Sequence, residues 1–493
     1  PVFTIKRQLT EGLRVHKQMT KNEADVEALN LLKSVRIPEP ERRLLQYPHE
    51  LSGGMRQRIV IAMALACNPK ILIADEPTTA LDVTIQAEIL TLLNRLKKET
   101  GTSILFITHD MAVVAQIADR VVVMYHGEKV EEGNVDEVFN NPKKDYTKKL
   151  ISSVPKLGAM KGKKYPEPLK LDSTNKTKSI KIVGTTKPLL EVKNLVTRFP
   201  VTGGMFRKKI ANLHAVEDVS FTINRGQTFS LVGESGCGKT TIARSVLRLE
   251  ESESGEVFMD GVDILKQNKK DLLRQRLNMQ MVFQDPYGSL NPVMKLFDQV
   301  AEPLINYKIA SGHNLNKKIS ELFDKVRLPR SFLNRYPHEL SGGQRQRVAI
   351  ARALALNPKL LILDEAVSAL DVSVQASVIN LLLDLQDELG LSYLFVSHDM
   401  AVVERVSHYV GVMYLGRMVE IGDRQTIFSN PTHPYTRALM KAVPIADPKN
   451  RFYKDDINFK PISSPIRDLG FVSEPSSYNM IKKGHYVLNN DIG

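Results

Sequence analysis

The chain has 493 residues, of which 42% are hydrophobic and 25% charged, an ordinary composition for a globular protein. This length allows two domains with full cores, and no apolar run approaches the ~20 residues that a membrane-spanning helix requires. The net charge of +13 suits anionic membrane surfaces or nucleic acid, or simply a lysine-rich solvated surface. The two cysteines, Cys67 and Cys237, exclude a disulfide framework and a four-cysteine zinc site.

A long internal repeat organises the chain. The segment Leu51–Arg58 returns at Leu340–Arg347, and both segments follow the pattern Leu-Ser-Gly-Gly-x-Arg-Gln-Arg. Ser52 and Ser341 are 289 residues apart. The same offset relates Asp75-Glu76 to Asp364-Glu365 and Thr108–Asp110 to Ser397–Asp399. A repeat that keeps its register over this length indicates two copies of a whole domain.

The repeat divides the chain into four parts. Residues 1–150 are the end of a first copy, 151–187 a linker, 188–445 a complete second copy and 446–493 a tail. The linker is predicted from its proline, glycine and charged residues and its lack of apolar periodicity. The tail contains Ser-Pro and Pro-Ser-Ser sequences and is expected to be loop-like.

Strands and helices alternate in the second copy, which predicts an α/β fold. The predicted strands are near-continuous apolar runs at 228–232, 359–363 and 391–397, and the predicted helices lie at 241–249, 320–326 and 340–357. Such apolar strands are typical of a parallel sheet that is covered on both faces. The last two helices are expected to build a helical insertion.

Between strand 228–232 and the helix that follows lies a phosphate-binding loop, or P-loop. Its pattern is Gly233-x-x-x-x-Gly238-Lys239-Thr240. Glycines let backbone N–H groups converge on phosphate oxygens, the lysine reaches the β- and γ-phosphates, and the threonine hydroxyl binds Mg²⁺. The residues predicted to contact ATP here are Gly233, Glu234, Ser235, Gly236, Cys237, Gly238, Lys239, Thr240 and Thr241.

Three further residues of the second copy follow predicted strands and are candidates for catalysis. Asp364 is placed to hold Mg²⁺, and Glu365 is placed to orient or deprotonate the attacking water. His398 is predicted to contact the γ-phosphate, because its setting recurs at His109. The alternative for the acidic pair is a solvated strand end, which the recurrence at Asp75-Glu76 disfavours.

Each copy also has a serine and two glycines at the start of a predicted helix. These are Ser52-Gly53-Gly54 and Ser341-Gly342-Gly343. A helix N-terminus with exposed N–H groups binds anions. An ordinary N-cap would explain each serine but neither the paired glycines nor their repetition.

Together these motifs resemble the ATP-binding cassette family. The resemblance covers about residues 1–150 and 189–445 and includes Ala-Leu-Asp at Ala80–Asp82 and Ala369–Asp371. It implies a P-loop NTPase core of RecA-like type with a helical subdomain that carries the Ser-Gly-Gly signature. It also implies that Gln284 binds Mg²⁺ and senses a membrane subunit, and that Phe199 stacks on adenine. By the same resemblance Asp82 and Asp371 are the aspartates of the D-loop.

Within that family the chain resembles the peptide-importer ATPases. The segment Asn430–Leu439 is similar to their C-terminal motif, and Asn141–Leu150 is its degenerate copy. The resemblance implies an ATPase that uses ATP and Mg²⁺ to import glutathione or short peptides. It implies two membrane-spanning permease subunits and a periplasmic binding protein as partners, and a peripheral position on the cytoplasmic face of the bacterial inner membrane.

The first copy shows no counterpart of the P-loop or of Gln284, whose repeat positions would precede residue 1. We therefore expect an N-terminally truncated domain that exposes apolar edges and faces and folds poorly alone. In the family, ATP lies between the P-loop of one copy and the signature of the other. One complete site is expected from Lys239, Thr240, Gln284, Asp364, Glu365 and His398 closed by Ser52-Gly53-Gly54. A degenerate site is expected from Ser341, Gly342, Gly343, Asp75, Glu76 and His109.

Other interpretations stay open at this point. A homodimer or a second ATPase chain could supply the missing P-loop. The chain could instead be a tandem cassette ATPase that acts on ribosomes or DNA, or an inactive remnant. The sequence favours an importer without nucleic acid as a partner, because it has neither an arginine-rich helix nor an aromatic platform.

Overall fold

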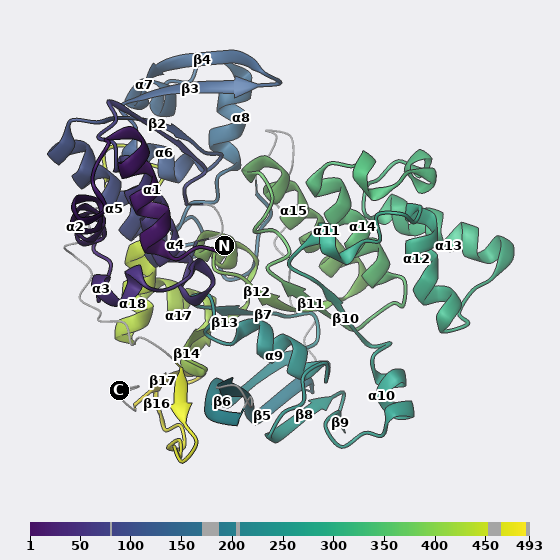
Figure 1. Ribbon diagram of the computed structural model, residues 1–493. Coiled ribbons are helices and arrows are strands. Elements are labelled where there is room, and N and C mark those ends of the chain that lie inside the picture. The colour runs from purple at the N-terminus through teal and green to yellow at the C-terminus, as the bar shows by residue number, and fades with distance from the viewer. Residues whose placement is uncertain (79–80, 170–186, 204–207, 452–464, 490–493) are drawn as a thin grey trace. The chain divides into compact units, whose positions relative to one another are not determined.

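The computed structural model describes residues 1–78, 81–169, 187–203, 208–451 and 465–489 (Figure 1). Ala80, residues 170–186 of the predicted linker and part of the tail, including Ser463 and Ser464, lie outside these residues. Internal contacts divide the chain into unit 1, Pro1–Thr147 with Pro444–Asp456, and unit 2, Lys148–Val443 with Ile457–Gly493. Within the described ranges, no helix combines the length and apolar character that crossing a membrane requires.

Unit 1 is built mainly of helices around an apolar core. Its elements are α1 (Ile5–His16), α2 (Lys21–Ser34), α3 (Pro40–Leu44), the 3₁₀ turn η1 (Pro48–Glu50), α4 (Gly53–Leu65), β1 (Ile71–Asp75), α5 (Val83–Thr100), β2 (Ser103–Ile107), α6 (Met111–Ile117), β3 (Arg120–Tyr125), β4 (Glu128–Asn134) and α7 (Val135–Asn140). Helix α8 (Asp145–Ser153) crosses the division between the units. Buried side chains of α1, α2, α4 and α5, such as Leu13, Leu32 and Leu93, form the core.

The strands of unit 1 form two small sheets. β1 pairs with β2 in parallel, and β3 pairs with β4 in antiparallel orientation. Burial alternates along β1, because the side chains of one face pack on the helical core while those of the other face are exposed. The exposed face carries large apolar side chains, including Ile73 at 66% and Leu105 at 55% exposure.

Unit 2 contains the remaining elements. They are β5 (Pro188–Gly203), β6 (Lys208–Asn224), β7 (Thr228–Val232), α9 (Lys239–Val246), β8 (Ser254–Met259), β9 (Val262–Asp263), α10 (Lys269–Gln275), β10 (Met279–Val282), α11 (Pro286–Ser289), α12 (Leu296–Asn306), α13 (Gly312–Lys325), η2 (Arg330–Asn334), η3 (Pro337–Glu339), α14 (Gly342–Leu354), β11 (Leu360–Asp364), α15 (Val372–Leu389), β12 (Ser392–Val396), α16 (Met400–Val406), β13 (Tyr409–Tyr414), β14 (Arg417–Asp423), α17 (Arg424–Ser429), α18 (Pro434–Ala442), β15 (Ile466–Asp468), β16 (Tyr478–Lys482) and β17 (His485–Leu488).

The central sheet of unit 2 has the strand order β10-β11-β12-β7-β13-β14-β17-β16. The first five strands are parallel, and every residue of β7, β11 and β12 is buried. The predicted parallel sheet and the predicted strand 228–232 are therefore confirmed. The predicted helix 241–249 was misplaced by a few residues: α9 begins at Lys239 and ends at Val246, since Arg248 takes a left-handed φ of 51°.

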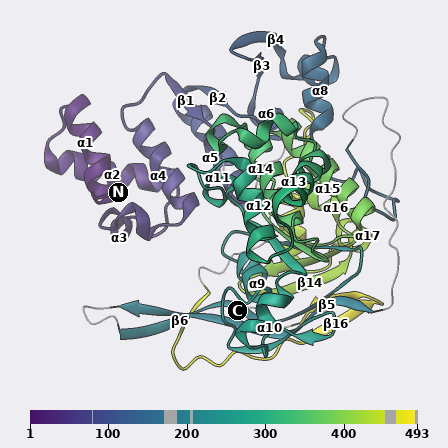
Figure 2. The same cartoon turned by 90° about the vertical axis from the view of Figure 1, so that its right-hand side faces the viewer.

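A second, antiparallel sheet in unit 2 was not predicted. Its strand order is β15-β6-β5-β8-β9, and Figure 2 shows the long strands β5 and β6 extending from the rest of unit 2. The tail was expected to be loop-like, and this was wrong for three segments. β15 joins this antiparallel sheet, while the hairpin of β16 and β17 joins the edge of the central sheet at β14. Edge pairing with a distant strand leaves little trace in the local sequence.

The first part of the predicted linker is attached to unit 2. The backbone N–H of Gly158 donates to Glu404 (2.7 Å). The side chain of Asn380 accepts from the N–H of Leu169 (2.7 Å) and donates to its carbonyl oxygen (2.8 Å). Met160 and Leu169 are buried. These contacts show that the segment is packed, although its composition predicts a solvated linker.

A sheet face that is exposed in unit 1 is covered at the equivalent position in unit 2. In unit 2, β7 lies between β12 and β13, whereas the equivalent strands β2 and β3 belong to separate sheets. Exposed apolar residues on β1, β2 and β3 include Ile71, Ile73, Leu105, Ile107 and Met124. Their equivalents in unit 2, which are Leu360, Ile362, Leu394, Val396 and Met413, are all fully buried. In unit 2 that face packs against α9 and the antiparallel sheet. The predicted exposure of apolar faces in the first copy is thus confirmed.

Candidate active site

The P-loop connects the end of β7 to the start of α9. Gly238 has a φ of 106°, and a Cβ atom there would lie 2.0 Å from the carbonyl oxygen of Ala215, so only glycine fits. Lys239 is 4% exposed, and its Nζ donates to the carbonyl oxygens of Gly233 (2.7 Å) and Glu234 (2.9 Å). The loop therefore forms a tight cradle around a buried ammonium group, which suits phosphate oxygens.

A hydroxyl and a carboxylate meet beside this loop. The Thr240 hydroxyl donates to Oδ1 of Asp364 (3.0 Å), although 124 residues separate them. Burial raises the pKa of Asp364 and the nearby charge of Glu365 adds to this, against the hydrogen bond from Thr240 and the charges of Arg244 and Lys239. Adjacent oxygen donors of this kind fit Mg²⁺, which keeps several waters and binds one or two protein groups together with substrate phosphates. The described residues contain no cluster of three or more His, Cys, Asp or Glu suited to a metal.

Glu365 is held by two residues from other strands. Gln284, which follows β10, donates from Nε2 to Oε2 of Glu365 (2.7 Å). His398, which follows β12, places Nδ1 3.5 Å from Oε1. Burial raises the pKa of Glu365, but the hydrogen bond and charge of His398, with the charge of Lys239, outweigh it and lower the pKa overall. The carboxylate is therefore ionised at neutral pH and can accept a proton or orient water.

Unit 1 repeats this last arrangement in a more open setting. Glu76 and Glu365 both adopt a left-handed backbone, with φ of 44° and 46°. Nδ1 of His109 lies 2.9 Å from Oε1 of Glu76. The Glu76 side chain is 43% exposed, compared with 9% for Glu365. Asp75, Glu76 and His109 thus keep the local geometry of the second copy without its enclosure.

The two Ser-Gly-Gly motifs begin helices, as predicted. Ser52 accepts from the backbone N–H of Met55 (3.3 Å) at the start of α4, and Ser341 accepts from that of Gln344 (3.4 Å) at the start of α14. Both serines are exposed, with Gly53 beside Ser52 also exposed. The second glycine of each motif has a packing reason that sequence reasoning missed. A Cβ atom on Gly343 would lie 2.1 Å from Cγ1 of Val374, so α14 could not pack as closely on α15.

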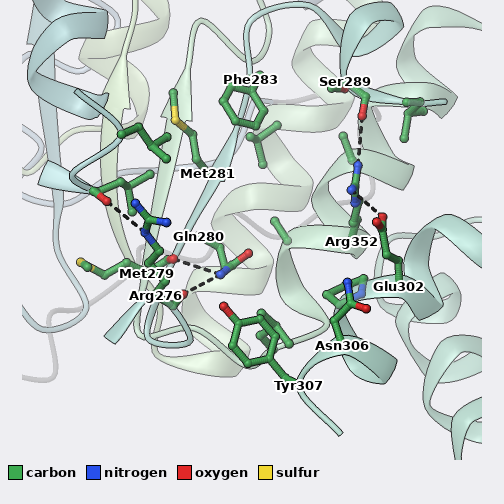
Figure 3. Close-up of a pocket in the computed structure, with 18 residues that line it drawn as sticks. Arg276, Met279, Gln280, Met281, Phe283, Ser289, Glu302, Asn306, Tyr307 and Arg352 are labelled. Atoms are coloured by element: carbon green, nitrogen blue, oxygen red, sulfur yellow. Dashed lines mark hydrogen bonds and ion pairs between the residues drawn. The ribbon is translucent and has the colours of Figure 1, made fainter. Parts of the chain in front are cut away.

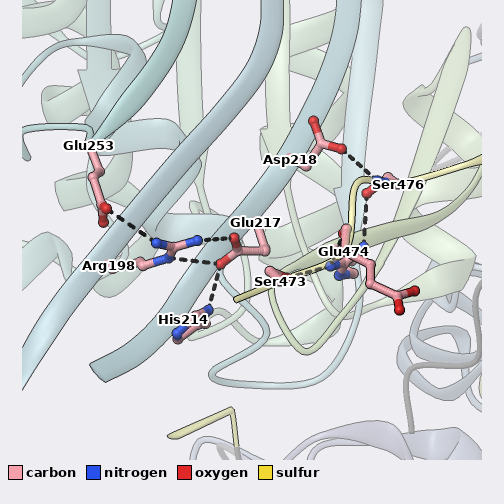
Figure 4. A network of polar contacts seen from close by, with 9 residues as sticks. Arg198, His214, Glu217, Asp218, Glu253, Ser473, Glu474 and Ser476 are labelled. Atoms are coloured by element: carbon pink, nitrogen blue, oxygen red, sulfur yellow. Dashed lines mark hydrogen bonds and ion pairs between the residues drawn. The ribbon is translucent and has the colours of Figure 1, made fainter. Parts of the chain in front are cut away.

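Phe199 stands on β5, where it pairs with Leu213 of β6 and is half-buried. Beside it Arg198 forms an ion pair with Glu217, which also accepts a hydrogen bond from Nδ1 of His214 (2.7 Å) (Figure 4). The same figure shows the tail next to this sheet, where the N–H of Ser476 donates to Asp218 (2.6 Å). These contacts fix the strand that carries Phe199. Its contact with adenine stays a prediction.

Unit 2 thus brings together the P-loop, Gln284, Asp364, Glu365 and His398. The predicted contribution of Ser52-Gly53-Gly54 to this site stays a prediction, because those residues belong to unit 1. Sequence reasoning missed Tyr435, whose hydroxyl accepts from the backbone N–H of Glu234 in the P-loop (3.0 Å). The one available signal was the recurrence of this tyrosine as Tyr146 in the degenerate copy of its motif.

A groove of about 340 Å³ lies near Gln284 (Figure 3). Its walls come from β10 and its flanks and from α12 and α14, and they include Phe283, Tyr307 and Ala353. Arg352 crosses between elements, donating to the carbonyl oxygen of Ser289 (3.0 Å) and to Glu302 (2.8 Å). Phe283 is exposed. The groove therefore offers an apolar surface directly next to a residue of the candidate site.

The chain is similar to known proteins over both of its halves. The family model for ABC transporters matches residues 2–79 and 216–368, and the model for the C-terminal region of oligopeptide/dipeptide transporters matches 130–179 and 419–463. The glutathione import ATP-binding protein GsiA of Pectobacterium atrosepticum is 49% identical over 100% of this chain and 80% of its own length. The chain belongs to the ATP-binding cassette family.

Other members of the family match as well. The glutathione import ATP-binding protein GsiA of Escherichia coli strain K12 is 51% identical over 99% of this chain and 79% of its own length. Among solved structures, cbiO1 of Clostridium perfringens, part of the ABC transporter complex cbiONQ, is 26% identical over 49% of this chain and 91% of its own, with a TM-score of 0.43. Each cassette-family model matches both halves of the chain, in agreement with the internal repeat.

Proposed function

We propose that this chain is the ATP-binding and ATP-hydrolysing subunit of an importer for glutathione or short peptides. The observation that carries this is the cluster in unit 2, where a P-loop lysine, a Thr240–Asp364 pair and a Glu365 held by Gln284 and His398 converge. The names of the similar proteins support the transported substrate. A role on ribosomes or DNA is not favoured, because those relatives are import proteins.

In this proposal each residue of unit 2 has a defined task. The P-loop N–H groups and Lys239 hold the β- and γ-phosphates, and Phe199 stacks on adenine. Thr240, Asp364 and Gln284 would hold Mg²⁺, which would supply the positive charge that neutralises the phosphates. Glu365 orients the attacking water and accepts its proton, while His398 positions the Glu365 carboxylate and contacts the γ-phosphate.

The two copies have unequal roles in the proposal. In the proposal, residues 188–445 form a complete ATPase domain, and residues 1–150 contribute the signature, acidic-pair and histidine motifs of a second one. Ser52-Gly53-Gly54 would close the complete site on its ATP. Ser341-Gly342-Gly343, Asp75, Glu76 and His109 would form a degenerate site that does not hold ATP with normal affinity. A second copy of the chain or another ATPase chain is the source we propose for a P-loop at that degenerate site.

The groove beside Gln284 is the proposed docking site for a permease subunit. Its apolar wall and its position next to Gln284 would let a docked segment shift that side chain, which itself holds Glu365. The full assembly in this proposal has two permease subunits and a periplasmic binding protein. The chain itself would be peripheral, at the cytoplasmic face of the inner membrane.

The proposal is tested by steady-state ATPase activity of the purified chain and four variants. Glu365→Gln is expected to lower kcat by about 100-fold or more, the usual effect of removing a catalytic base. Its repeat-matched control, Glu76→Gln, should keep most of the activity. Ser52→Ala should reduce activity more than its own counterpart, Ser341→Ala.

Each outcome separates one part of the proposal from the others. If Glu365→Gln loses activity while Ser52→Ala keeps it, unit 2 hydrolyses ATP without the first copy. ATP binding is also measured for the parent chain and for a fifth variant, Lys239→Ala. If the two bind ATP equally weakly, the P-loop assignment is wrong and the chain is an inactive remnant.

A further inference from the structure

The importer motif near the C-terminus lies against the P-loop in unit 2. Tyr435, at the start of α18, is 1% exposed, and its hydroxyl accepts the backbone N–H of Glu234 at 3.0 Å. Its ring lies 4.5 Å from that of Tyr414, the last residue of β13. β13 is the direct neighbour of β7, which leads into the P-loop. Tyr435 is thus fixed by a central strand while its hydroxyl contacts the loop.

The position of Tyr435 is set by a buried polar cluster. Glu420 on β14 is fully buried, and its Oε1 accepts from the N–H of Thr432 (2.9 Å) and from Nε2 of His485 (2.8 Å). Its Oε2 accepts from the N–H of His433 (3.0 Å). His433 in turn accepts the N–H of Tyr435 on its Nδ1 (3.2 Å). The carboxylate therefore holds the turn that begins α18, where a buried polar group without partners would be costly.

The first copy offers an internal comparison. Tyr146 and Tyr125 stand at the repeat positions of Tyr435 and Tyr414, and their rings are 4.4 Å apart. The tilted ring pair is therefore a property of both copies. Among the described residues, the contact between this tyrosine and a P-loop is seen in the second copy, where the backbone N–H of Glu234 meets Tyr435.

We propose that the Asn430–Leu439 motif is a positioning device for nucleotide binding, in which Tyr435 fixes the P-loop through the N–H of Glu234. This inference rests on the proposed ATP-binding role of that loop. Phosphate binding by backbone N–H groups requires the loop to be held in its binding conformation before the ligand arrives. Tyr435 is a positioning residue: it acts through Glu234 and is not assigned a contact with substrate.

The test compares Tyr435→Phe with Tyr146→Phe in the full chain. Phenylalanine keeps the ring and its contact with the neighbouring tyrosine, and removes only the hydroxyl. For Tyr435→Phe, we expect the Kd for ATP and the KM to rise roughly fivefold, the effect of one net hydrogen bond, with kcat changed less than about twofold. Tyr146→Phe should leave both constants unchanged. A purely structural role would lower the melting temperature without changing the Kd of the folded protein, and that result would overturn the proposal.

A second readout does not depend on ATP. Hydrogen exchange at the P-loop peptide of the nucleotide-free chain should be faster in Tyr435→Phe and unchanged in Tyr146→Phe. Glu420→Gln, which weakens the support of the α18 turn, should accelerate the same peptide. Equal protection in parent and Tyr435→Phe would refute the inference. Faster exchange together with no ATP binding by the parent would instead refute the proposed function and leave the positioning contact standing.

Discussion

Ile73 and Ile362 occupy the same position in the two repeats, yet Ile73 is 66% exposed and Ile362 is fully buried. Both residues lie in the middle of a strand that pairs in parallel with the next strand of its copy. The difference arises from what packs against the sheet face that carries each isoleucine. In unit 2 that face is covered by α9 and the antiparallel sheet, whereas the corresponding face of unit 1 is exposed.

This difference predicts that a charged side chain is strongly destabilising at position 362 and nearly neutral at position 73. Ile362→Lys should destabilise unit 2 by several kcal/mol, because an unpaired ammonium would be buried in an apolar core. Ile73→Lys should change stability by less than about 0.5 kcal/mol, as for an exposed position. Urea unfolding followed by hydrogen exchange at β1 and β11 measures each copy separately. An equal loss in both variants would mean that the face of β1 is covered in solution.

The close approach of α14 and α15 makes the two signature glycines unequal. Gly343→Ala should cost roughly 1–3 kcal/mol, because the new methyl group overlaps Val374. Gly342→Ala is the matched control, since its Cβ would be 3.6 Å from the nearest atom, on Leu370. Thermal unfolding of the two variants, and of Gly343→Ala combined with Val374→Ala, checks the packing reason. If the double variant is not partly restored, overlap with Val374 is not the cause.

The ionised Asp364 carboxylate is expected to lower the stability of the folded protein although ATP hydrolysis requires it. Because burial raises its pKa in the folded state, its contribution favours folding at acidic pH and is lost as pH rises through the folded pKa. At neutral pH the buried carboxylate therefore costs stability, and Asp364→Asn should melt higher than the parent. The gain should shrink as the pH is lowered into the acidic range. The same variant should lose Mg²⁺-dependent ATP hydrolysis, and a lower melting temperature at neutral pH would contradict the account.

Phe283 separates ATP hydrolysis from transport if the groove is the permease docking site. Phe283→Ala removes an exposed ring from the groove without touching Glu365 or the P-loop. The isolated chain should hydrolyse ATP within about twofold of the parent, and glutathione uptake by the assembled transporter should fall at least tenfold, the loss of about 1.4 kcal/mol in coupling. Leu389→Ala, an exposed apolar residue at the end of α15, is the surface control. Normal uptake by Phe283→Ala would place the docking site elsewhere.

Local patterns in the sequence were sufficient for much of the fold. The apolar runs identified β7, β11 and β12 because buried parallel strands need side chains of that kind on both faces. The P-loop could be located because its function requires glycines, a lysine and a hydroxyl at fixed spacing. The repeat then assigned Glu76 and His109 by register alone, and the structure shows them in contact.

The tertiary structure decided what depends on distant partners. The sequence by itself determined the α/β class, the internal repeat and the residues of each motif, since these follow from residue type and spacing. It did not determine the packed linker, strand β15 of the tail or the bond from Glu234 to Tyr435, because in each case the partners lie about two hundred residues apart or more. The exposed face of unit 1 is of the same kind: Ile73 and Ile362 are the same residue in equivalent strands, and only what packs on them differs.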